Sequence, residues 1–118
     1  MITSTETATS VEATVQRTVI QAGDYLNKLS GEQIEYECKR SLEAGCRELV
    51  VNFSETELVN SIGISILLGV IDTASNNGAT VVFSDVNENT VELFEMLGIT
   101  KHVILAKAAH NSQNYGGT

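Results

Sequence analysis

The chain is poor in aromatic and basic residues, and both shortages narrow the range of its partners. Aromatic residues make up 5% of the 118 residues, and tryptophan is absent. A platform that binds nucleic acid by stacking bases needs more aromatic faces than this. Seven Lys and Arg residues stand against 15 Asp and Glu residues, so the formal net charge is -8 at pH 7. Such a surface repels phosphate backbones and anionic lipids, so we expect neither nucleic acid nor a membrane as a partner. A basic patch on another protein fits better.

Sorting signals and long apolar segments are also missing. Residues 1–14 are polar and lack the basic and apolar regions of a secretory signal peptide. The most apolar stretch, residues 62–71, is interrupted by glycine and serine and is too short to span a bilayer. We therefore expect a cytoplasmic protein.

Two cysteines, Cys38 and Cys46, are too few for a disulfide framework. No histidine or further cysteine stands near them at metal-ligand spacing. We expect no metal and no cofactor. Cys38 is expected to be buried and inert, and Cys46, which follows a glycine, to be more exposed.

Short apolar runs alternate with amphipathic segments along the chain. The runs predict strands at 15–22, 25–26, 49–53, 80–83 and 102–105. Helices are expected from an N-cap at Ser30 to about residue 44, over 61–76, and from about 90 to 97. In the last helix, Val91, Phe94 and Leu97 are expected to be buried, with Met96 also in the core. Residues 54–60 are expected to be a plain connection.

This alternation predicts an α/β fold. We expect a small single domain in which amphipathic helices pack on a mixed sheet of four or five strands. The domain is expected to span 15–106, between a flexible N-terminal segment, 1–14, and a flexible tail, 107–118.

The most informative stretch is Val59-Asn60-Ser61-Ile62-Gly63, where a strand leads through a loop into a helix. Asn60 is a favoured N-cap residue, which would put Ser61 at the first helical position. A phosphate on Ser61 would meet unpaired backbone N–H groups and the positive end of the helix dipole. A purely structural interpretation is commoner for such a pattern: Asn60 and Ser61 only cap the helix, and Gly63 only permits close packing.

Several segments, taken in order, resemble stand-alone STAS domains of the anti-sigma factor antagonist type. Residues 48–53 and 60–63 are similar to the family's strand and its Asp-Ser-Ser-Gly-like motif, and Gly23-Asp24-Tyr25-Leu26 resembles its early turn. Residues 78–83 and 91–99 are similar to its next strand and its last helix. The match covers about residues 15–106.

The resemblance implies a substrate and binding partner rather than a catalyst. In that family, the serine corresponding to Ser61 accepts phosphate from an anti-sigma factor that is also a serine kinase. The unphosphorylated domain binds the kinase, the phosphorylated domain releases it, and a phosphatase resets the switch. The resemblance also implies partner contacts near the start of the second helix and at Gly23 and Asp24.

Two departures from the motif surround Ser61. Asn60 stands where the family has aspartate, and Ile62 stands where it has a second serine. Asparagine caps a helix about as well as aspartate but carries no charge, so phosphorylation could be slower. Equally, because Asn60 carries no negative charge to repel a phosphate on Ser61, the phosphorylated form could be more stable.

Three other functions remain open. A constitutive scaffold or transport-complex subunit, without a phosphoswitch, is favoured by the replaced motif residues. Small-ligand or nucleotide binding lacks a phosphate-cradling glycine loop. An enzyme is the weakest candidate, because no Ser-His-Asp, Cys-His or paired-carboxylate spacing indicates catalysis.

Overall fold

The computed structural model describes residues 16–107. Its elements follow in the order β1 (Arg17–Gln21), β2 (Tyr25–Leu26), α2 (Lys28–Glu43), β3 (Glu48–Asn52), β4 (Leu58–Val59), α3 (Ser61–Asn76), β5 (Thr80–Ser84), α4 (Glu88–Met96), a 3-10 helix η2 (Ile99–Lys101) and β6 (Ile104–Ala106). The predicted alternation is confirmed, with β4 and η2 added to it. The segments expected to be flexible, 1–14 and 107–118, lie outside the described residues except for Lys107.

Four strands form the main sheet in the order β1-β3-β5-β6, and β2 and β4 form a separate two-stranded sheet. Every strand pair among residues 16–107 is parallel. The predicted α/β class is confirmed, whereas the expected mixed pairing is corrected for this part of the chain. The reason is that α2, α3 and α4 each return the chain to the starting end of the next sheet strand, which makes neighbouring strands parallel.

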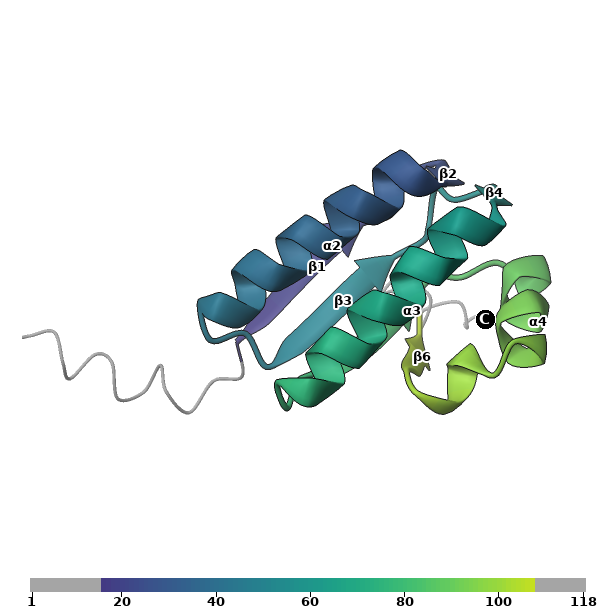
Figure 1. The fold of residues 1–118 in the computed structure, drawn as a ribbon. Coiled ribbons are helices and arrows are strands. Elements are labelled where there is room, and N and C mark those ends of the chain that lie inside the picture. Colours follow the sequence, from purple (N-terminus) through teal and green to yellow (C-terminus); the bar gives the residue numbers. More distant parts are fainter. Residues whose placement is uncertain (1–15, 108–118) are drawn as a thin grey trace, which may run out of the picture.

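The core lies between one face of the main sheet and the helices. Helices α2 and α3 lie side by side across that face (Figure 1). Alternate residues of the strands point toward them and are buried: Ile20, Leu49, Val51, Val81 and Phe83. The helices contribute Ile34, Cys38, Leu67, Val70, Ile71 and Ala74. This matches the predicted apolar stripes except at their ends, since Leu42 is only partly buried and Ile62 is 52% exposed.

Three phenylalanines attach α4 to this core. The ring centroids of Phe53 and Phe83 lie 5.0 Å apart, and those of Phe53 and Phe94 lie 5.7 Å apart, both with edge-to-face geometry. Such aromatic pairs add stability beyond the area they bury.

Helix α2 starts one turn before the expected position, because Asn27 and not Ser30 is its N-cap. The Asn27 side chain accepts a hydrogen bond from the Ser30 N–H at 3.0 Å. In return, the Ser30 hydroxyl accepts one from the Asn27 N–H at 2.9 Å. Ser30 is thus the third helical residue in a reciprocal capping box, where a serine does the work usually done by Glu or Gln.

One connection and one cysteine differ from expectation. The expected connection 54–60 contains β4, which pairs with β2 in register Tyr25↔Leu58 and Leu26↔Val59. Cys38 is buried as expected, but the expectation that Cys46 is exposed is wrong, because it is 5% exposed. Its Sγ hydrogen bonds to the Glu48 carbonyl at 3.1 Å, at the start of a central strand.

The end of α4 also differs from expectation. Phe94 is buried, Val91 is half-buried, and Met96 and Leu97 are 82% and 49% exposed. Met96, two residues after Phe94, projects from the opposite side of α4, and Leu97 is the C-cap that follows the last helical residue. Their assignment to the core was wrong for that reason.

Candidate functional site

Ser61 is the first residue of α3, and only Asn60 separates it from β4. Asn60 has extended backbone angles, φ -112° and ψ 168°, and its side-chain oxygen accepts a hydrogen bond from the Gly63 N–H at 2.8 Å. Its backbone carbonyl accepts the first helical hydrogen bond, from Ile64 at 3.0 Å. The predicted N-cap at Asn60 is confirmed, and Ser61 is exposed at the rim of the helix.

Two backbone N–H groups in this first turn are available to an anion. Those of Ser61 and Ile62 have no acceptor among the described residues, as expected at the start of a helix. The first turn of α3 contains no acidic residue. The positive end of the helix dipole is therefore not neutralised by a side chain of this turn.

Gly63 has a steric role at the same place. A Cβ built on Gly63 would lie 2.6 Å from the Leu26 carbonyl oxygen and 2.9 Å from the Asn27 nitrogen. The backbone of α3 thus packs directly on the junction between β2 and α2. Another backbone contact adjoins it, since the Asn60 N–H donates to the Leu26 carbonyl at 2.9 Å.

The early turn at Gly23 and Asp24 is tied to the loop that leads to Ser61. Gly23 has a φ of +85°, which favours glycine. Its carbonyl accepts a hydrogen bond from the buried Thr56 hydroxyl. The Asp24 carbonyl accepts hydrogen bonds from the N–H groups of Glu57 at 2.9 Å and Leu58 at 3.2 Å. The structure therefore brings the two predicted contact regions together through the β2–β4 pair.

Exposed apolar side chains surround this junction. Tyr25 is 39%, Leu29 69%, Leu58 61% and Ile62 52% exposed. They come from β2, β4 and the first turns of α2 and α3, which lie at one end of the domain (Figure 1). We call these four residues the Ser61 patch.

Sequence reasoning missed most of the Ser61 patch. The Tyr25 hydroxyl lies 3.3 Å from the Asn60 side-chain nitrogen, which donates to it. Leu58 was placed in a connection, although its neighbour Val59 is half-buried. The two adjacent apolar residues Leu58 and Val59, flanked by Glu57 and Asn60, were only a weak signal of β4, because two residues are too few to show alternation.

The described residues offer no other obvious chemistry at this end. Within residues 16–107, no group of three or more His, Cys, Asp or Glu side chains is placed to hold a metal ion. None of the helices in that range is both long and apolar enough to cross a membrane. Burial raises the pKa of the Cys38 thiol to about 11, so this thiol remains protonated and unreactive at neutral pH.

Comparison with known proteins shows where this fold occurs elsewhere. The family model for the STAS domain matches residues 7–112. No curated protein matches the chain. The solved structure of the anti-sigma factor antagonist SpoIIAA in its unphosphorylated form is similar, with a TM-score of 0.65 and 15% identity over 88% of this chain and 91% of that one.

Two further structures are similar. The Bacillus cell fate determinant SpoIIAA in its phosphorylated form also has a TM-score of 0.65 and 15% identity, over 89% of this chain and 94% of that chain. A sulfate transporter family protein from Wolinella succinogenes has a TM-score of 0.72 and 8% identity, over 88% of each chain. At these identities the likeness establishes the fold.

Proposed function

This chain belongs to the STAS domain family, and we propose that it is a protein-binding switch controlled by phosphorylation of Ser61. In this proposal its partner is an anti-sigma factor that is also a serine kinase. The kinase binds the unphosphorylated chain, phosphorylation releases it, and a phosphatase restores binding. The chain acts in the cytoplasm by binding and not by catalysis.

The position of Ser61 is the observation that carries the proposal. Its hydroxyl is exposed, and its backbone N–H and that of Ile62 have no acceptor among the described residues. A phosphate added there accepts hydrogen bonds from the free N–H groups and is attracted by the positive end of the α3 dipole, so the fold tolerates it. The solved forms of SpoIIAA, one unphosphorylated and one phosphorylated, resemble this chain equally well, which fits a switch that keeps its fold.

The Ser61 patch explains how a phosphate would change binding. Tyr25, Leu58 and Ile62 offer a partner an apolar surface next to Ser61. A phosphoserine brings about -1.5 to -2 charges at pH 7, and burying that charge against an apolar partner is costly. The phosphate thus stabilises the free domain and opposes the complex.

The rim of this surface fits a partner with basic residues. Asp24 and Glu57 are exposed beside Tyr25 and Leu58, and the chain carries a net charge of -8. Opposite charges at the rim increase the association rate more than the affinity. We therefore propose that Asp24 contributes to partner approach and that Gly23 fixes the turn that presents it.

The direct test uses a candidate kinase, to be sought as a histidine-kinase-like ATPase among the products of the neighbouring genes. The full chain is incubated with the kinase and ATP, and the phosphate is located by mass spectrometry. We expect phosphate on Ser61. We expect Ser61→Asp to weaken kinase binding at least tenfold and Ser61→Ala to leave binding intact while abolishing phosphate incorporation.

Ser65 is the matched control, because it is also exposed on α3 but lies one turn further along. Ser65→Asp adds a similar charge without the N-terminal position, so it is expected to weaken binding far less than Ser61→Asp. Phosphate found only on Ser65 or elsewhere, or equal binding by Ser61→Asp and the unmodified chain, would contradict the proposal.

A constitutive scaffold or transport-complex subunit is the second candidate. Asn60 and Ile62 replace two residues of the family's phosphorylation motif, and a sulfate transporter family protein shares the fold. A complex that forms equally well with the unmodified, Ser61→Ala and Ser61→Asp chains, and that contains no kinase, would favour this function over the switch.

A further inference from the structure

A cavity away from the Ser61 patch lies between α4 and the ends of β5 and β6. Its volume is about 510 Å³, within the range of small-molecule sites. It opens at the carboxyl ends of parallel strands, where α/β proteins commonly bind ligands. None of its lining residues belongs to the Ser61 patch, so a ligand here would not compete with the proposed partner for the same atoms.

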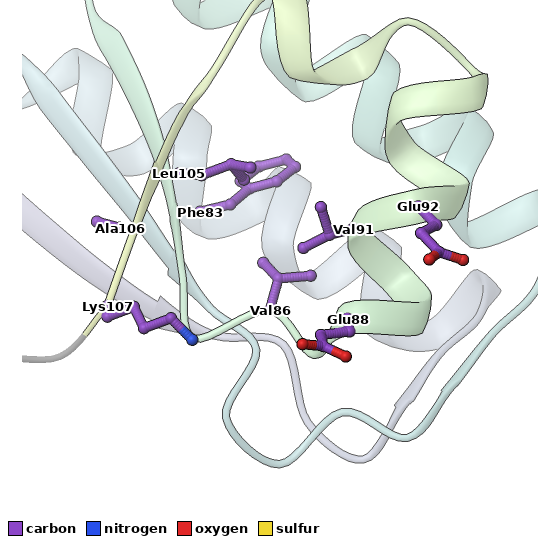
Figure 2. A pocket seen from close by; sticks show the side chains of 8 residues that line it. All are labelled: Phe83, Val86, Glu88, Val91, Glu92, Leu105, Ala106 and Lys107. Atoms are coloured by element: carbon purple, nitrogen blue, oxygen red, sulfur yellow. The ribbon is translucent and has the colours of Figure 1, made fainter. Parts of the chain in front are cut away.

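The inner wall of the cavity is apolar. Phe83 and Val86 come from β5 and the segment after it, Val91 comes from α4, and Leu105 comes from β6. Figure 2 shows these four side chains gathered at the centre of the cavity. Leu105 is 41% exposed although its neighbour in register, Phe83, is fully buried. An apolar group entering here would cover Leu105 without displacing the core.

Charges of both signs line the same cavity. Glu88 and Glu92 lie on α4, and Lys107 follows β6. In Figure 2, the Lys107 amino group and the Glu88 carboxylate extend from opposite walls toward the side where Val86 lies. The two ion pairs found among residues 16–107, Arg17–Glu48 and Lys28–Glu32, involve none of these groups. The opposite charges therefore line the same cavity without forming an ion pair across it.

We propose that this cavity binds a small zwitterion with a large apolar side chain, of the free α-amino acid class. The side chain packs on Phe83, Val91 and Leu105. The carboxylate pairs with Lys107, and the ammonium group pairs with Glu88. A ligand with only one charge leaves the opposite charged residue without a partner and partly shielded from water, which lowers its affinity.

The test is an NMR titration of the ¹⁵N-labelled full chain with L-phenylalanine. Three analogues each lack one feature: 3-phenylpropanoate has no ammonium group, 2-phenylethylamine has no carboxylate, and glycine has no apolar side chain. We expect saturable shifts centred on residues 83–92 and 104–107 with phenylalanine. Each analogue is expected to bind at least threefold more weakly.

Charge-removing variants test the assigned roles. Glu88→Gln and Lys107→Gln are each expected to weaken phenylalanine binding about twofold to fivefold, as for exposed ion pairs. Glu95→Gln is the matched control: it removes the same charge from an exposed residue of α4 that does not line the cavity. It is expected to leave binding unchanged.

Three results would overturn the proposal. The first is an absence of saturable shifts up to about 20 mM phenylalanine, which lies above the millimolar affinity expected for so few contacts. The second is a set of shifts centred on the Ser61 patch. The third is equal binding of phenylethylamine or phenylpropanoate, which would show that one charge suffices. Kinase binding and phosphorylation of Ser61 do not enter these readouts, so the two proposals fail separately.

Discussion

Gly63 and Gly69 lie on the same helix but in different surroundings. A Cβ on Gly63 would meet backbone atoms of Leu26 and Asn27 at less than 3 Å, whereas a Cβ on Gly69 would meet nothing within 4 Å. Backbone atoms cannot move aside as the end of a flexible side chain can. Gly63 is therefore needed because a larger residue would clash, whereas Gly69 has no such role and only lowers the stability of the helix, as glycine generally does.

We predict opposite effects of the same substitution at these two positions. Gly63→Ala is expected to lower the free energy of unfolding by about 2 kcal/mol because of overpacking. Gly69→Ala is expected to raise it by about 0.5 to 1 kcal/mol because alanine favours the helix. Urea unfolding followed by circular dichroism measures both. A Gly63→Ala chain as stable as the parent would show that α3 can move away from β2 at little cost.

Cys38 gives a prediction about pH. Burial raises its pKa to about 11 from an ordinary value of 9.0, with smaller contributions from Cys46 and Glu35. The unfolded chain loses this proton from about pH 9 upward, while the folded chain keeps it until about pH 11. Stability from this group is therefore complete below pH 9 and is lost as the pH rises toward 11.

The expected loss between pH 9 and 11 is about 1 to 2.5 kcal/mol. Urea unfolding at a series of pH values, for the parent and for Cys38→Ala, measures it. The variant is less stable throughout because it leaves a cavity, but its stability should fall less steeply over this range. Parallel curves for the two chains would rule out Cys38 as the source.

At the scale of the element, the start of α3 combines a cap, the proposed phosphorylation site and a packing contact within four residues. Asn60→Asp restores the charge that the family motif has before the acceptor serine, and it keeps the side-chain oxygen that accepts from Gly63. A negative charge at a helix N-terminus is also favourable, by about 0.3 to 1 kcal/mol.

We predict that Asn60→Asp raises both the stability and the rate at which the kinase phosphorylates Ser61. Unfolding in urea measures the first, and initial rates of phosphate incorporation measure the second. Asn87→Asp is the control, because Asn87 caps α4 in the same way, with its side-chain oxygen 2.8 Å from the Thr90 N–H. It is expected to change stability but not the phosphorylation rate. A slower rate for Asn60→Asp would mean that the added charge repels ATP or the phosphate.

Helices and strands whose apolar residues recur at a clear period were predictable from the sequence. The junctions between them were less predictable. For α3, the apolar stripe predicted the position of the helix, and the cap at Asn60 predicted its first residue. The start of α2 was missed because Asn27 and Ser30 both suit an N-cap, and the reciprocal pair of hydrogen bonds is visible only in three dimensions. β4 was missed because a strand of two residues, Leu58 and Val59, is too short to show alternation.

The candidate site was predictable in part for the same reason. Residues 60–63 are contiguous, so their local geometry follows from capping rules. The Ser61 patch joins four separate elements, and its assembly depends on the parallel pairing of β2 with β4. No local pattern encodes that pairing. Met96 and Leu97 show the converse, since both are apolar yet exposed: Met96 projects from the side of α4 opposite Phe94, and Leu97 lies at the C-cap.

At the scale of the whole molecule, the two faces of the main sheet have different surroundings. Val51 faces α2 and α3 and is fully buried, whereas Val19, on the opposite face, is 54% exposed. Ile104 lies on that opposite face at the other edge and is 53% exposed. Among residues 16–107 the helices gather on the first face (Figure 1).

We predict that shortening a valine to alanine costs more stability on the covered face of the sheet than on the opposite face. Val51→Ala is expected to lower the free energy of unfolding by about 2 to 3 kcal/mol, through lost burial and the cavity left behind. Val19→Ala, in the neighbouring strand, is expected to cost less than about 1 kcal/mol. Thermal and urea unfolding measure both. Equal losses would show that Val19 is covered by another part of the chain or by a second molecule.

Parallel pairing also aligns the dipoles of the three helices. Because each helix follows a strand of the same orientation, α2, α3 and α4 all begin at one end of the domain, and each start contributes about half a positive charge. Their caps, Asn27, Asn60 and Asn87, are all neutral; Glu88 in the first turn of α4 offsets part of that helix's dipole, whereas the first turn of α3 has no acidic residue. In a chain with a net charge of -8, the start of α3 at Ser61 therefore keeps a local positive dipole, although Asp24 and Glu57 are exposed nearby. A dianion placed there is partly balanced by the backbone itself, before any lysine or arginine is involved.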